Sequence, residues 1–192
     1  MRRFSFRPSL TLRGREFKGL RGFAGKPFHP PLTDVPVGAY ILAPAFDVIS
    51  TIGGADNRWA TDFYRAATFV LIGGALVSLL AALTGFWDWL RSTEPGNQAR
   101  RTANAHMTVM LVLTTVVIVD IVLRLANYDD PHTPVAVLIL SLIAAVLVTV
   151  GGTIGGGLAF DYGFNVETAG DSPVWHESET DVMPGGKAAA GR

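Results

Sequence analysis

Residues 135–150 read VAVLILSLIAAVLVTV, where Ser141 and Thr149 are the only polar side chains and no charge occurs. A helix on the surface of a soluble protein keeps a polar stripe that faces water, and this stretch has none. A bilayer core of about 30 Å is crossed by about 20 apolar residues in a helix. The stretch therefore predicts a membrane-spanning helix over about Thr133 to Phe160, rather than the core of a soluble helical bundle.

Three further stretches are long and apolar enough to span a bilayer: Val35 to Ile52, Ala66 to Trp89, and Ala105 to Ala126. The first of them contains Pro44, which predicts a kink. The connections between the four spans are too short for a second folded domain. The sequence thus predicts an all-α fold, an integral membrane four-helix bundle.

The predicted bundle occupies residues 34–162, between two polar segments of opposite composition. Residues 1–33 form a basic arm, in which Phe17, Leu20 and Phe23 recur at three-residue spacing among Arg and Lys. That spacing suits either an interfacial helix on anionic lipid or a disordered basic tail. Residues 163–192 are acidic, rich in Gly, Ala and Ser, and expected to be disordered.

Lys and Arg are distributed very unevenly between the two sides of the predicted bundle. Eight precede the first span, three lie between the second and third spans, and two lie in the tail. The opposite side has only three: Arg58, Arg65 and Arg124. Because Lys and Arg concentrate in cytoplasmic loops, we predict a multi-pass protein of the cell inner membrane with both termini in the cytoplasm.

The overall composition excludes several classes of function. The formal net charge is zero, so no bulk field points to nucleic acid as a partner, and the bilayer is the expected surrounding. The absence of cysteine excludes a disulfide, a thiolate zinc site and a cysteine-ligated iron–sulfur cluster. We find no nucleophile–base motif, phosphate-binding loop or dinucleotide fingerprint, so an enzyme is not favoured.

Polar side chains gather at the predicted cytoplasmic ends of the spans. His29 and Asp34 lie before the first span, Asp88 closes the second, and His106 opens the third. Because four helix ends of a small bundle lie near one another, these side chains could converge on a transition metal or a haem. We expect the stretch from His29 to Asp34 to be extended or turned, because Pro30 and Pro31 interrupt it.

Other roles for the same residues remain open. Asp34 is well placed to cap the first helix, where its carboxylate would accept backbone N–H bonds. The histidines could bond to neighbouring helix ends, handle protons or contact quinone, since buried polar groups need partners but rarely a metal. We therefore keep a structural role beside the cofactor site.

A second polar group lies deeper, toward the opposite membrane surface. Asp47 and Asp120 fall about 20 Å along their helices from Asp34 and His106, respectively. Arg124 follows Asp120 by one turn on the same helix face. An interhelical ion pair of these three residues would keep their charges out of lipid, so we favour a structural clamp over a proton or ion path.

Several of these residues belong to motifs that we recognise in a known family. The stretch Gly25 to Ala39, which reads GKPFHPPLTDVPVGA, is similar to the opening motif of an uncharacterised family of bacterial four-helix membrane proteins. The resemblance continues through Thr84 to Trp89, His106, and Gly155-Gly156 with Tyr162-Gly163, and it covers about Gly25 to Val166. It implies a four-helix membrane domain of unknown function.

The resemblance implies that in some members of that family the domain is fused ahead of a Rieske iron–sulfur domain. This chain has no cysteine and so carries no such domain, and Lys26 stands where the family motif usually has a histidine. The resemblance therefore implies a redox-associated module whose partner would be a separate redox protein or a larger membrane complex.

Two functions follow from the sequence. One is a redox-associated module in which a cofactor, either a haem or a transition metal, is held by His29, Asp34, Asp88 and His106. The other is a structural scaffold or accessory subunit with no cofactor. A transporter has little support, because the four spans show neither a repeated half nor a broken helix pair.

Overall fold

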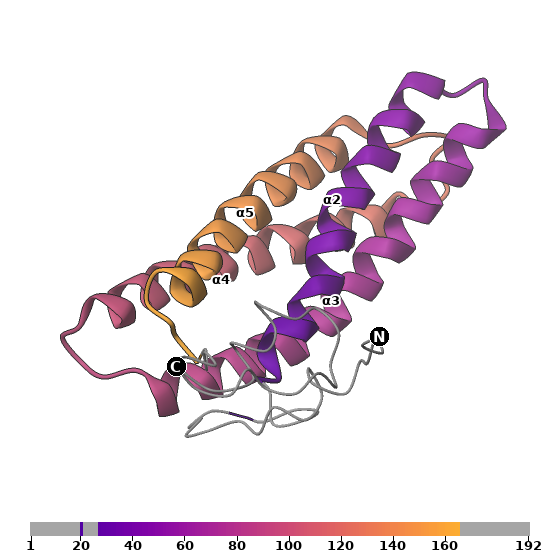
Figure 1. The fold of residues 1–192 in the computed structure, drawn as a ribbon. Helices are drawn as coiled ribbons and strands as arrows, with labels where there is room; N and C mark the ends of the chain where they lie inside the picture. Colours follow the sequence, from indigo (N-terminus) through magenta and orange to yellow (C-terminus); the bar gives the residue numbers. More distant parts are fainter. Residues whose placement is uncertain (1–19, 21–26, 166–192) are drawn as a thin grey trace, which may run out of the picture.

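The computed structural model describes Leu20 and residues 27–165, and these form an antiparallel bundle of long helices (Figure 1). In chain order they are α2 (His29–Gly53), α3 (Arg58–Ser92), α4 (Gln98–Ala126) and α5 (Val135–Phe160). Each is long and apolar enough to cross a membrane. The predicted all-α four-helix membrane bundle is confirmed, whereas the predicted helix or disorder of the arm and tail lies outside the described residues.

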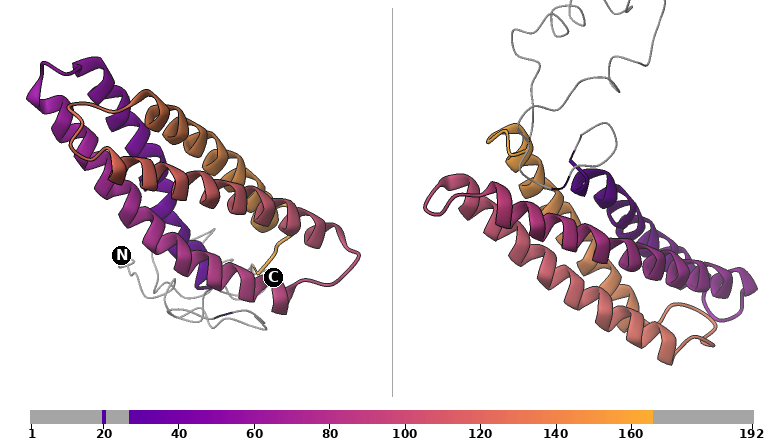
Figure 2. Two further views of the ribbon diagram at one scale, coloured as in Figure 1. Left: turned by 180° about the vertical axis from the view of Figure 1, so that it is seen from behind. Right: turned by 90° about the horizontal axis from the view of Figure 1, so that it is seen from below.

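The bundle is built from two hairpins, α2 with α3 and α4 with α5 (Figures 1 and 2). One end, here called the histidine end, contains the start of α2, the 93–97 connection and the end of α5. The other, here called the arginine end, contains the short connections at 54–57 and 127–134. Both predicted polar groups therefore fall at ends of the bundle rather than at its centre.

Alanines are frequent in the core, beside larger side chains such as Tyr40 and Leu113, and many large apolar side chains cover the outside. Ala43, Ala67 and Ala144 are fully buried, whereas Ile52 and Leu83 are 78% and 68% exposed. This is the reverse of a soluble domain, because lipid tails are as apolar as leucine and close packing of small residues drives helix association in a bilayer. The outward-facing side chains therefore contact lipid.

The first helix begins earlier than predicted, and its opening turn is helical rather than extended. α2 starts at His29, with Pro30 and Pro31 in its first turn. The first four N–H groups of a helix have no intrahelical acceptor, so proline removes nothing there, and its fixed φ suits the helix. Consequently Asp34 lies inside the helix, exposed, and does not cap it: the cap position is Phe28, without a side-chain bond.

Within α2 the helix continues through Pro36 and Pro44, both buried. A glycine of α3 allows the backbone of α2 to come close there. A Cβ built on Gly74 would lie 2.5 Å from the Cβ of Ala39 and 3.3 Å from the ring of Tyr40. Gly74 thus sets the separation of the first hairpin.

We expect Gly74→Ala to destabilise the bundle by about 1–3 kcal/mol, because the added methyl group must push α2 away from α3. Gly73→Ala is the matched control, since a Cβ at Gly73 meets nothing within 4 Å. Thermal unfolding of both variants in detergent measures the difference. Equal melting of Gly74→Ala and wild type would contradict the close approach.

Candidate functional site

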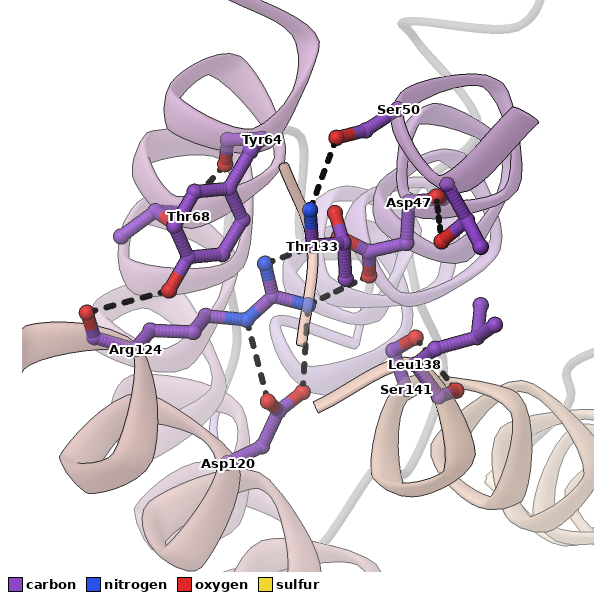
Figure 3. A network of polar contacts seen from close by, with 10 residues as sticks. Asp47, Ser50, Tyr64, Thr68, Asp120, Arg124, Thr133, Leu138 and Ser141 are labelled. Atoms are coloured by element: carbon purple, nitrogen blue, oxygen red, sulfur yellow. Dashed lines mark hydrogen bonds and ion pairs between the residues drawn. The ribbon is translucent and has the colours of Figure 1, made fainter. Parts of the chain in front are cut away.

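A fully buried ion-pair network occupies the arginine end (Figure 3). The Arg124 guanidinium donates to both carboxylate oxygens of Asp47, from Nη1 at 3.0 Å and from Nη2 at 2.5 Å. Its Nε donates to Asp120 at 3.0 Å. All three side chains have no exposed surface. The structure thus brings together the three residues predicted to pair, from α2 and α4.

Neutral polar groups surround this network and join it to the rest of the bundle. The Thr133 hydroxyl donates to Asp47 at 3.2 Å, and the Thr133 N–H donates to the Ser50 hydroxyl at 2.9 Å. The Tyr64 hydroxyl of α3 contacts the Arg124 carbonyl at 3.3 Å (Figure 3). The charged group is therefore tied to α2, α3, α4 and the connection before α5.

Sequence reasoning did not identify Ser50, Tyr64 and Thr133 as part of this network. Ser50 follows Asp47 by about one turn, and that spacing was the one available signal. Tyr64 and Thr133 lie far from their partners along the chain, so only the packing of the helices shows what they bind.

At the histidine end, each of two histidines bonds to the backbone of the neighbouring helix. Nδ1 of His29, on α2, is 2.8 Å from the carbonyl oxygen of Ala81 on α3. Nδ1 of His106, on α4, is 2.9 Å from the carbonyl oxygen of Gly151 on α5. Because a carbonyl oxygen only accepts, Nδ1–H is the donor in both, and Nε2 of each neutral ring carries a lone pair.

A glycine lies against each imidazole. A Cβ built on Gly85 would lie 2.7 Å from Cε1 of His29, and one on Gly155 would lie 3.2 Å from Cε1 of His106. Across the part of the chain that the structure describes, the hydrogen bonds of both rings are made through Nδ1. Within Leu20 and residues 27–165, neither Nε2 atom has a hydrogen-bond partner.

Asp88 lies near this pair, but Asp34 does not join it. Asp88 is buried on α3, accepts the Leu20 N–H at 3.0 Å, and is close enough to interact electrostatically with His29. Asp34 follows His29 by five positions, which on a helix turns its side chain about 140° away. The structure therefore does not bring the exposed side chain of Asp34 to the histidines, because the segment from His29 to Asp34 is helical.

Over Leu20 and residues 27–165, no group of three or more His, Cys, Asp or Glu side chains is arranged to hold a metal ion. Two imidazoles alone do not complete the coordination of a transition-metal ion, so the remaining ligands would have to come from other groups. What the histidine end offers is a pair of oriented imidazoles with Asp88 beside one of them.

These features define a class of protein: an integral membrane four-helix bundle with one ion-paired end and one histidine end. The chain belongs to the family described as predicted membrane protein DUF2231, which it matches over residues 25–168. The resemblance seen in the sequence is thereby confirmed. No curated protein and no solved structure matches the chain.

We expect Arg124→Ala to destabilise the bundle by roughly 3–5 kcal/mol, because it leaves two buried carboxylates without their counter-ion. Arg65→Ala is the control: Arg65 pairs at 3.4 Å with Asp129, whose side chain is 95% exposed. Such a surface pair contributes at most about 1 kcal/mol. Detergent unfolding compares the two, and an unchanged melt for Arg124→Ala would argue against the clamp.

Proposed function

We propose that this protein is a redox-associated membrane module that holds a metal-containing cofactor, a haem or a transition metal, between His29 and His106. The observation that carries the proposal is the matched orientation of the two rings. A metal-binding histidine characteristically donates its other ring N–H to a carbonyl or carboxylate, which orients the ring and selects the tautomer. Here Nδ1–H of each ring donates to a backbone carbonyl and Nε2 is left for the cofactor.

The surroundings of the pair suit an electron carrier that must retain its cofactor. Asp88 places a buried carboxyl group at the same end of the bundle as His29. The bound metal would supply one-electron chemistry, while the chain's own residues hold and orient it. Since residues 1–192 contain no cysteine, an iron–sulfur centre that exchanges electrons with this module would have to lie outside them.

The Asp47, Arg124 and Asp120 network has a structural role in this proposal. It ties the ends of the helices opposite the histidines, so that the two hairpins stay in register. A clamp of this kind needs no ligand, because each carboxylate already accepts bonds from the guanidinium.

A scaffold without a cofactor is the alternative, and one observation favours it. Both histidines already join neighbouring helices through Nδ1, which is enough to satisfy a buried donor. In that case the protein would be an accessory subunit of a larger membrane complex, and Nε2 of each ring would have no ligand.

Metal analysis of the detergent-purified chain by plasma mass spectrometry tests the proposal. We expect near-stoichiometric metal in the wild type and in His132→Ala, whose histidine lies in the connection between α4 and α5. The metal should be lost in His29→Asn and His106→Asn, whose amide N–H stands where Nδ1–H stood and keeps a donor for the carbonyl. Absence of metal in wild type from cells supplied with metals and haem precursor would favour the scaffold.

The uneven distribution of Lys and Arg supports an orientation with both termini and the histidine end in the cytoplasm. We expect the tail after Gly163 to be protected from added protease in right-side-out membrane vesicles and cleaved in inverted ones. Cleavage in right-side-out vesicles would reverse the orientation and place the redox partner on the other side.

A further inference from the structure

The two hairpins match each other position by position. Corresponding residues of α2 and α4 differ by 77 in residue number, so that His29 corresponds to His106 and Asp47 corresponds to Arg124. The same shift relates further buried positions of the two helices, in the following pairs: Pro36 with Leu113, Tyr40 with Val117, and Ala43 with Asp120. From Leu113 onward, every buried residue of α4 therefore has a buried counterpart in α2.

The second helices of the hairpins match with a shift of 70 residues. This shift relates the two carbonyls that accept the histidine bonds, Ala81 and Gly151, and the two glycines that lie against the rings, Gly85 and Gly155. It also superimposes other buried positions: Ala67 with Val137, Leu71 with Ser141, Gly74 with Ala144, and Asp88 with Leu158.

A repeated half is not visible in the pattern of side chains, but the buried positions of the two hairpins reveal one. α2 and α4 run in the same direction, so the repeat is a parallel one, related by an approximate two-fold axis along the membrane normal. The ion pair between Asp47 and Arg124 joins equivalent positions and so lies on that axis. The repeat was hidden because paired positions have different side chains, such as Tyr40 and Val117.

We infer that the histidine site is a two-fold site that takes one planar macrocycle with two like faces, a b-type haem, with one imidazole contributed by each hairpin. The inference rests on the proposed function and names its ligand. A metal ion held by the protein alone takes three or four protein ligands, whereas a haem can be held by two histidines. The histidine end would supply that number, with one equivalently placed imidazole from each hairpin.

Gly85 and Gly155 are the positioning residues of this site. In both hairpins the same edge of the ring faces the glycine: Cε1 is nearest to the built Cβ, then Nδ1, then Nε2. The distances are 2.7, 2.9 and 3.2 Å at Gly85, and 3.2, 3.4 and 4.0 Å at Gly155. A methyl group at either position would therefore turn or displace the ring, and more strongly at Gly85.

The test uses the full chain, purified in detergent from cells supplied with haem precursor. The variants are Gly85→Ala and Gly155→Ala, with Gly73→Ala and Gly152→Ala as controls on the same two helices, because a Cβ at either control position meets nothing within 4 Å. The readouts are the pyridine haemochrome, the electron paramagnetic resonance spectrum of the ferric protein and its midpoint potential. Thermal unfolding of every variant accompanies them.

We expect a single haem per chain with a low-spin, six-coordinate spectrum in wild type and both controls. Gly85→Ala should shift the g values and the potential or lose the haem, and Gly155→Ala should shift them less. If Gly85→Ala fails to fold, the milder contact at Gly155 decides the positioning role.

Other outcomes separate the inference from the proposed function. Metal without porphyrin would overturn the haem and leave the cofactor module standing. A high-spin, five-coordinate haem would overturn the two-fold site. A low-spin haem unchanged by both glycine variants would overturn the positioning role. A wild-type protein with no metal at all would overturn the function together with the inference.

Discussion

A guanidinium buried between two carboxylates is the constraint on which the rest of this bundle depends. Arg124 has no exposed surface and donates to Asp47 on α2 and Asp120 on α4. A charge with no exposed surface is costly without a partner, so the two helices must stay in the register that keeps the pair together. Thr133 and Tyr64 extend that requirement to α3 and to the connection before α5.

The histidine end depends on this register. His29 and His106 reach their carbonyl partners only because the glycines of α3 and α5 let the helices and rings approach closely. Small residues at helix contacts are the usual means of association in a bilayer, where the hydrophobic effect offers no drive between helices. Glycines therefore serve both the packing, at Gly74, and the histidine end, at Gly85 and Gly155.

Both ends of the bundle are formed by equivalent positions of the two hairpins. Equivalent positions carry an acid and a base at one end, and a histidine each at the other. At the arginine end the two halves bear opposite charges, which neutralise each other. At the histidine end they bear like side chains, which suits a ligand whose two faces are alike. The fold thus separates a structural end from the end proposed to bind a cofactor.

The four spans could be predicted from the sequence because apolar length is a local property, and so could the pairing of Asp120 with Arg124, which are one helical turn apart. The start of α2 at His29 was missed because proline is neutral in a first helical turn but disruptive elsewhere. The carbonyls of Ala81 and Gly151, the ring contacts of Gly85 and Gly155, and the repeat were decided by tertiary structure alone. Each joins residues on different helices, and their relative height and rotation arise from packing, which no local pattern of side chains encodes.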